Sequence, residues 1–223
     1  MNPGVSFLIF LKGQLSVVKM VSYWVAQMAG AFAGSILVYL CTTGLTDNLE
    51  SAGEPPFNLG STTLAHDRLT VWNGFFLELI GSTVFYFVIA QTALDKRGIA
   101  TSAFPAIPIG LILVVVNIGL IPLTGCGLNP ARTFGPSALT CLLTDTDTCE
   151  SVADFSWYWI YYAGPFLAAI IVAEVTTWMS LDFGEHEEQQ AITGAAETPH
   201  KLVSAKREAA PAQMLWTSHE ESI

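Results

Sequence analysis

Two short motifs in this chain place an asparagine before a proline and a small residue. They are Asn2-Pro3-Gly4 and Asn129-Pro130-Ala131. Asparagine is among the best N-cap residues, and proline is favoured at the first position of a helix. Each motif therefore predicts a helix start that is capped by the asparagine side-chain oxygen. The NH2 group of the same side chain keeps its hydrogen-bond donors.

Two such asparagines facing one narrow passage would bind a water molecule through its oxygen. The hydrogens of that water would point away from the centre, which interrupts the donor–acceptor chain that proton hopping requires. The positive ends of two helices that meet there add an electrostatic barrier to cations and protons. The pair of motifs thus predicts a passage for water or small neutral solutes, with nothing chemically transformed.

The approach to the second motif is rich in glycine, Thr124-Gly125-Cys126-Gly127-Leu128. We expect this segment to run extended and to present a row of carbonyl oxygens, those of Gly125, Cys126, Gly127 and Leu128. Arg132 is the only charged residue between positions 98 and 144. A cation within a membrane is costly unless it faces a wet cavity, so Arg132 and the carbonyls predict a filter. The alternative is that Arg132 pairs with a carboxylate of an outer loop.

The two motifs belong to an internal repeat. Each opens a short apolar segment, 5–11 or 134–143, followed by a long apolar span that contains Ala-Gly-x-Phe. A segment of about ten residues is half a membrane crossing. We therefore expect two half-helices that enter from opposite faces and meet near the midplane. Within the second copy of the repeat, two full spans precede the Asn-Pro motif, whereas none precedes it in the first copy, so we expect the chain to lack two N-terminal spans.

Composition favours a membrane protein, because only 13% of the 223 residues are charged and 52% are hydrophobic. Soluble domains carry about 25% charged residues. A large soluble helical protein, the alternative, would need polar outer faces that the apolar stretches lack. A net charge of −10 argues against nucleic-acid binding.

Four stretches are long enough to span a bilayer: Val17 to Leu40, Val71 to Leu94, Phe104 to Ile121 and Phe155 to Leu181.

Charges in the connecting segments predict the orientation, since basic segments alternate with acidic ones and basic segments stay cytoplasmic. This places the C-terminus in the cytoplasm. Cys141 and Cys149 then fall in an outer loop, where a disulfide is permitted.

We expect residues 1–181 to form a channel domain and residues 182–223 to form an acidic, disordered tail. No CxxC pair, metal cluster, phosphate loop or nucleophile–base pair is present, so we expect no metal, no cofactor and no enzyme.

Glycines four residues apart occur in the first span, at Gly30 and Gly34. Small residues at this spacing let two helix backbones approach closely in a membrane. The alternative is that glycine is simply common in membrane helices.

The segment from Thr124 to Arg132, continuing to Gly135-Pro136, resembles the second Asn-Pro-Ala signature of the aquaporin, or major intrinsic protein, family. The resemblance covers about Met1 to Leu181. It implies an all-helical, aquaporin-like inverted repeat, here with four full transmembrane helices and two re-entrant half-helices. It also implies a homotetramer in the lipid bilayer.

The resemblance also suggests roles for single residues. Asn2 and Asn129 resemble the paired pore asparagines. Arg132, Cys126 and Asn117 match filter positions, and in many members the residue at the position of Cys126 is a mercury-sensitive cysteine. Two further residues, Gln27 and Glu78, resemble buried polar residues that hold the re-entrant loops. The alternative for these two is that each is satisfied within its own helix.

Departures from the family pattern bear on which solute passes. Gly4 stands where the signature has alanine, and Asn117 stands where water channels usually have histidine and glycerol channels glycine. Four residues resemble the water-selective branch: Thr133, Ser137, Tyr161 and Tyr162. A water channel is the leading hypothesis. The alternatives are a glycerol-type facilitator, a non-conducting fragment or structural subunit, and an ion-coupled transporter, which would need carboxylates facing the substrate path.

Overall fold

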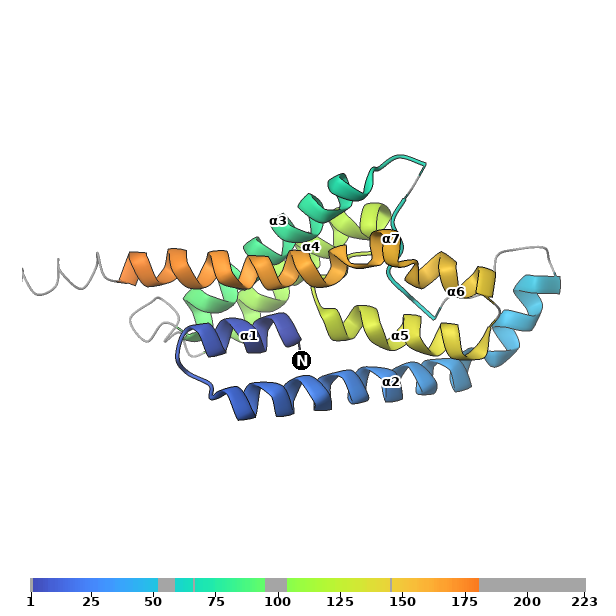
Figure 1. Ribbon diagram of the computed structural model, residues 1–223, viewed down its shortest axis with the longest axis horizontal. Coiled ribbons are helices and arrows are strands. Elements are labelled where there is room, and N and C mark those ends of the chain that lie inside the picture. Colours follow the sequence, from blue (N-terminus) through green and yellow to red (C-terminus); the bar gives the residue numbers. More distant parts are fainter. Residues whose placement is uncertain (1, 52–58, 66, 95–103, 145, 181–223) are drawn as a thin grey trace, which may run out of the picture. The chain divides into compact units, whose positions relative to one another are not determined.

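The computed structural model describes residues 2–51, 59–65, 67–94, 104–144 and 146–180 (Figure 1). These residues are mostly helical, and none of them lies in a strand. One compact unit, Met1–Thr177, holds all the labelled helices, and a second, Trp178–Ile223, is described only for its first three residues. The predicted tail, residues 182–223, lies outside the described residues.

Both Asn-Pro motifs start helices, as predicted. Helix α1 (Pro3–Leu11) has Asn2 as its N-cap, and the Oδ1 atom of Asn2 accepts a hydrogen bond from the Gly4 N–H at 2.9 Å. Helix α5 (Pro130–Leu143) has Asn129 as its N-cap, which accepts from the Ala131 N–H at 3.0 Å. Asn2 and Asn129 both have extended backbone angles, so the two helices begin with the same N-cap conformation and the same type of hydrogen bond.

Helices long and apolar enough to cross a membrane are found in all four predicted places. They belong to α2 (Val17–Ser51), to α3 (Val71–Ile89) with the π-helical turn η1 (Ala90–Leu94), to α4 (Ala106–Thr124) and to the region Thr146–Ser180. This last region contains α6 (Thr146–Ala153), α7 (Phe155–Tyr158) and a helix over residues 160–180. Helix α2 continues well beyond the predicted end at Leu40, since no proline interrupts it before position 55.

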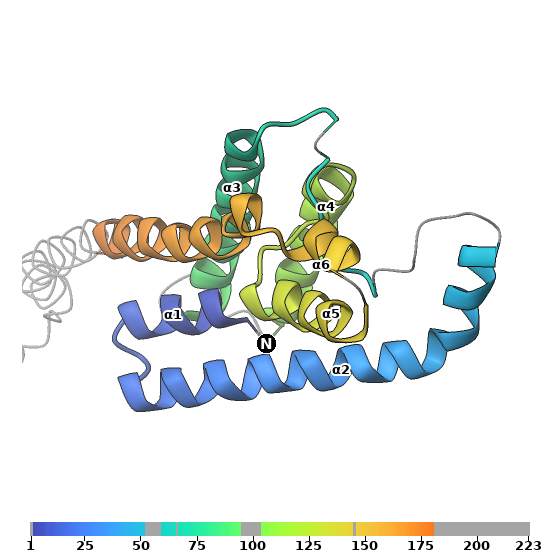
Figure 2. The same ribbon diagram turned by 45° about the vertical axis from the view of Figure 1, so that its right-hand side comes forward.

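Helix α2 packs against both α1 and α5, which follow one another along it, while α3 packs against α4 (Figure 2). The contact between α2 and α5 is made backbone to backbone at Gly135. A Cβ atom added to Gly135 would lie 2.6 Å from the carbonyl carbon and oxygen of Ala31. A Cβ added at Gly30 or Gly34 would meet nothing within 4 Å. Within the described part of this chain the two glycines therefore allow no close approach, which favours the alternative that glycine is simply common in membrane helices; helix α5 meets α2 at Ala31, between them.

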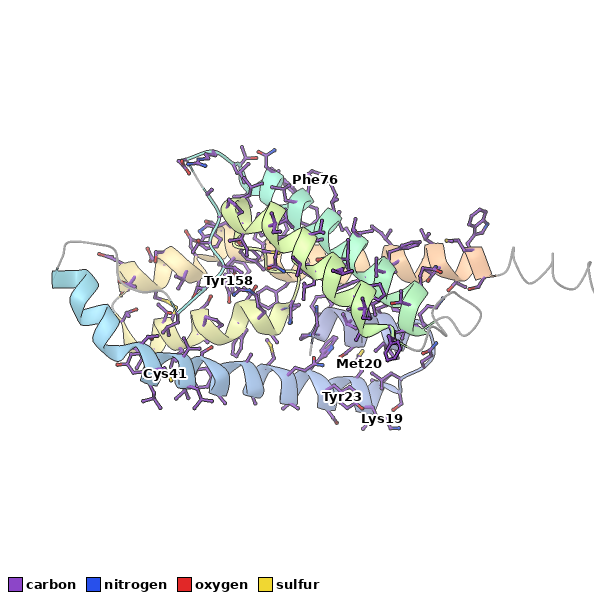
Figure 3. All side chains as sticks on the ribbon, turned by 180° about the vertical axis from the view of Figure 1, so that it is seen from behind. Lys19, Met20, Tyr23, Cys41, Phe76 and Tyr158 are labelled. Atoms are coloured by element: carbon purple, nitrogen blue, oxygen red, sulfur yellow. A yellow bond between two sulfur atoms is a disulfide. The ribbon has the colours of Figure 1, made fainter. Side chains whose placement is uncertain are left out.

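The main apolar core lies where α1, α3 and the helix over residues 160–180 meet. Its buried members include Leu8, Phe85, Ile89, Ala168 and Val172. Away from this core, α2 and α4 expose large apolar side chains, as lipid-facing helices do. Among the exposed residues of α2 are Tyr23 and Cys41 (Figure 3).

A disulfide joins Cys141, near the end of α5, to Cys149 in α6. The sequence permitted this pair but did not establish it. The bond ties the short helix α6 to the end of α5, and the two helices pack against one another.

Candidate functional site

The two Asn-Pro motifs meet at their tips. The Nδ2 atom of Asn2 donates a hydrogen bond to the carbonyl oxygen of Leu128 at 2.9 Å, although the two residues are 126 positions apart. Leu128 directly precedes Asn129, so the N-terminal ends of α1 and α5 face one another (Figure 1). Asn2 and Leu128 are both buried. Two positive helix ends therefore converge at one point inside the protein.

Glu78 supports the segment that leads to the second motif. Its Oε1 atom accepts hydrogen bonds from the Thr124 hydroxyl at 2.6 Å and from the Gly127 N–H at 2.9 Å. Its Oε2 atom accepts from the Leu128 N–H at 2.8 Å. The side chain is fully buried, and all three partners lie outside its own helix. The carboxylate thus satisfies backbone N–H groups that no helix or sheet satisfies.

The segment before Asn129 does not run extended, contrary to the prediction. The φ angles of Gly125, Cys126 and Leu128 are 71°, 53° and 52°, all in the left-handed region. Residues other than glycine rarely adopt this region. The conformation is held because the neighbouring N–H groups are fixed on Glu78. The glycine-rich sequence alone did not reveal this conformation, because the contacts that hold it come from a residue of another helix.

Arg132 is held by backbone carbonyls. Its Nη1 atom donates to the Gly60 oxygen at 2.7 Å, and its Nη2 atom donates to the Gly125 oxygen at 3.4 Å. Among the described residues, the only ion pair joins Arg68 to Asp67. The alternative that Arg132 pairs with an outer-loop carboxylate thus has no support in the described part of the chain.

The other two predicted filter residues form no hydrogen bond with Arg132 among those found in the described residues, although Cys126 directly follows Gly125, whose oxygen Arg132 binds. Cys126 is 2% exposed, and its side chain belongs to a small apolar cluster with Leu120 and Leu128. Asn117 is half-buried on α4, and its Nδ2 atom donates to the Leu113 oxygen of the same helix at 2.8 Å. None of the hydrogen bonds found in the described residues joins Asn117 to Arg132. Its place in a filter stays a prediction.

Side chains from α2 hold the first motif. The Nε2 atom of Gln27 donates to the Ser6 hydroxyl at 2.9 Å, and Ser6 in turn donates to the Asn2 carbonyl at 3.2 Å. The indole N–H of Trp24 donates to the Pro3 oxygen at 3.0 Å. Gln27 therefore reaches across to α1, as Glu78 reaches across to the segment before α5.

Three of the four residues expected to distinguish water channels from glycerol channels form hydrogen bonds with other side chains or with the backbone. Tyr161 donates to the Thr124 oxygen at 2.6 Å. Thr133 accepts from the Thr62 hydroxyl at 3.3 Å, and Ser137 is buried. The Tyr162 hydroxyl donates to that of Tyr158 at 3.2 Å.

Several residues at the site were assigned no role of their own from the sequence. They are Trp24, Gly60, Thr62, Tyr86 and Thr124. The run Gly60-Ser61-Thr62-Thr63, which interrupts an acidic segment, was a usable signal for two of them. Tyr86 had none, because a tyrosine within an apolar span is ordinary. No group of three or more His, Cys, Asp or Glu side chains that could hold a metal ion lies among the described residues.

Comparisons with known proteins identify the family and the fold of the chain. The family model described as major intrinsic protein matches residues 1–175. The chain is 32% identical over 175 residues to the probable aquaporin PIP2-6 of Arabidopsis thaliana, covering 77% of this chain and 54% of that protein. It is 32% identical over 188 residues to aquaporin-1 of Mus musculus, covering 82% of this chain and 61% of that protein. This chain thus spans between half and two thirds of the length of these curated relatives.

A solved structure shares the fold. The aquaglyceroporin from Plasmodium falciparum matches with a TM-score of 0.64 over 78% of this chain and 69% of that chain, at 23% sequence identity. The apolar helices and the related sequences together show a multi-pass integral membrane protein. Because the family model matches far more than half of its residues, this chain belongs to the major intrinsic protein family.

Proposed function

We propose that this protein is a passive transmembrane channel for water, open also to small neutral solutes, in which no substrate is chemically changed. The observation that carries the proposal is the hydrogen bond from Asn2 to the residue just before Asn129. It brings the N-terminal ends of two helices to one buried point. A pair of positive helix ends favours neutral solutes over cations at that point.

In this proposal Asn2 and Asn129 are the pore asparagines. The Oδ1 atom of Asn2 caps α1, and one Nδ2 hydrogen is used on Leu128. The second Nδ2 hydrogen is then the donor for the oxygen of a passing water. A water fixed by its oxygen cannot relay a proton through the junction, so water passes and protons do not.

The filter of this proposal consists of Arg132, Asn117, Cys126 and the carbonyls before Asn129. Support comes from the position of Arg132, whose guanidinium is held on the Gly60 and Gly125 oxygens. A fixed cation repels other cations while its remaining donors bind neutral polar solutes. Thr133, Ser137, Tyr161 and Tyr162 favour water over glycerol by resemblance. A homotetramer with its C-terminus in the cytoplasm completes the proposal, also by resemblance.

Stopped-flow light scattering on vesicles that contain the full-length protein tests the proposal. After a hyperosmotic step, we expect these vesicles to shrink faster than protein-free vesicles. Asn2→Asp keeps the oxygen that caps α1 but replaces the NH2 donor with a negatively charged oxygen. We therefore expect this variant to be more permeable to cations such as sodium. Asn73→Asp is the matched control, because Asn73 is exposed and its Oδ1 atom acts only as an acceptor from Thr70.

The outcomes separate the functional alternatives. Shrinkage no faster than that of protein-free vesicles would overturn the proposal and favour a non-conducting structural subunit. Fast swelling in glycerol, equal to the water response, would favour the glycerol-type facilitator. If the Asn2→Asp and Asn73→Asp variants have the same low sodium permeability, the proposal that the junction excludes cations electrostatically is wrong.

A further inference from the structure

Position 4 carries the departure from the Asn-Pro-Ala signature, and the structure shows what occupies the place of the missing methyl group. A Cβ atom added to Gly4 would overlap the Tyr86 hydroxyl oxygen. It would also lie 2.9 Å from Cζ and 3.1 Å from Cε2 of the same ring. The ring belongs to α3 and is itself a buried member of the main apolar core. An alanine at position 4 therefore does not fit beside this tyrosine.

The Tyr86 hydroxyl lies within hydrogen-bond distance of the ends of both helices. It is 2.9 Å from the carbonyl oxygen of Leu128 and 3.2 Å from the Oδ1 atom of Asn2, and the shorter distance assigns its single hydrogen to Leu128. The side chain is fully buried. A buried hydroxyl requires a partner, and here both available partners are atoms of the junction itself. Tyr86 thus links the ends of α1 and α5 from a third helix.

This contact changes which carbonyl oxygens are available to a solute. A carbonyl oxygen has two lone pairs, and that of Leu128 receives Asn2 Nδ2 and the Tyr86 hydroxyl. Its acceptor capacity is used within the protein. Of the four carbonyls expected to line the passage, the one nearest the asparagine pair is therefore not an acceptor for water.

We propose that Gly4 and Tyr86 form a matched pair, in which Tyr86 is a positioning residue for the junction. Its hydroxyl fixes the Asn2 side chain against Leu128 and occupies the Leu128 carbonyl. A passing water then finds the donors of the junction beside a Leu128 carbonyl whose lone pairs are both used. The effect on passing water rests on the proposed channel function, whereas the steric match between Gly4 and Tyr86 does not.

Four variants test the pair: Gly4→Ala, Tyr86→Phe, Tyr86→Leu and the double variant Gly4→Ala/Tyr86→Leu. Leucine removes the far end of the ring that the alanine methyl would overlap. We expect Gly4→Ala and Tyr86→Leu each to lower the melting temperature of the purified full-length protein. The double variant should melt above both single variants, because the new methyl group fills the space left by the ring. The controls are Gly30→Ala, with open space around the added methyl group, and Tyr23→Phe, at an exposed tyrosine.

Tyr86→Phe keeps the ring and removes only the hydroxyl. It frees one lone pair of the Leu128 carbonyl, so water at the junction can donate as well as accept. We expect the ratio of proton to water permeability to rise severalfold, measured in vesicles with a trapped pH-sensitive dye and by stopped-flow shrinkage. This ratio does not depend on how much protein is folded, so a purely structural role would leave it unchanged.

A Gly4→Ala variant that melts like Gly30→Ala, or a double variant no more stable than the single ones, would overturn the matched pair. An unchanged permeability ratio in Tyr86→Phe, equal to that of Tyr23→Phe, would overturn the positioning role. If the parent protein passes no water, the proposed function fails instead. The steric match between Gly4 and Tyr86 would still be tested in that case, because the melting temperatures do not depend on water flux.

Discussion

The carboxylate of Glu78 accepts a hydrogen bond from the Thr124 hydroxyl at 2.6 Å, across 46 residues of sequence. Glu78 lies in the middle of α3 and Thr124 ends α4. The same carboxylate accepts two backbone N–H groups of the segment that follows. Irregular backbone at membrane depth is tolerated only where protein satisfies its polar groups. This residue pair therefore positions the segment before Asn129.

Glu78→Gln should destabilise that segment although it barely changes the shape of the side chain. Both carboxylate oxygens act as acceptors, and the glutamine NH2 group would oppose a donor at one of them. An unsatisfied buried donor costs about 1–3 kcal/mol. Thermal unfolding of the purified protein measures the loss. Glu174→Gln is the control, since Glu174 is exposed on the last helix; equal melting temperatures for the two variants would contradict the role of Glu78.

Gly135→Ala should weaken the packing of α5 on α2. The added methyl group would lie 2.6 Å from backbone atoms of Ala31, which cannot rotate away as a side chain could. Overpacking of this kind costs about 1–3 kcal/mol. Gly30→Ala, on the same stretch of α2, has open space and should stabilise the helix slightly. A melting temperature of Gly135→Ala at or above that of the parent protein would show that the helices can separate without cost.

Arg132→Ala should relax selectivity. It removes the fixed cation and the donors to the Gly60 and Gly125 oxygens, so larger neutral solutes and cations meet a weaker barrier. We expect glycerol and urea uptake by vesicles to rise severalfold relative to water flux. The control is Arg68→Ala, because Arg68 is exposed and pairs with the neighbouring Asp67. The same selectivity in both variants would remove Arg132 from the filter.

Mercurial reagents should distinguish the two free cysteines found in the described residues, buried Cys126 and exposed Cys41. If Cys126 borders the passage, its modification obstructs water flux and Cys126→Ser abolishes the inhibition. Cys41→Ser should leave the inhibition unchanged, because Cys41 is on the exposed face of α2. Stopped-flow shrinkage with and without the reagent measures both. A parent protein that the reagent does not inhibit would exclude Cys126 from the filter.

The helices could be predicted from sequence because their causes are local. Asn2 and Asn129 cap helices through hydrogen bonds that reach two residues along the chain. The apolar stretches identify the four long helices because a bilayer requires about 20 consecutive apolar residues. The end of α2 was missed for a related reason, since no local signal stops the helix near Leu40.

The contacts that join the two motifs could not be predicted in this way. Asn2 and Tyr86 reach Leu128 across 126 and 42 residues, and Arg132 reaches Gly60 across 72. Neither hydrophobic periodicity nor helix capping carries information about contacts between residues so far apart in the sequence. They depend on which faces of α1, α3 and α5 pack together, and the left-handed φ angles before Asn129 follow from that packing. The sequence by itself determined the helix starts and the apolar spans. The repeat of the two motifs also led us to expect that the asparagine-capped ends meet. Only the tertiary structure decided which atoms join them and that Tyr86 occupies the space beside Gly4, because these contacts depend on how helices that are distant in the sequence pack together.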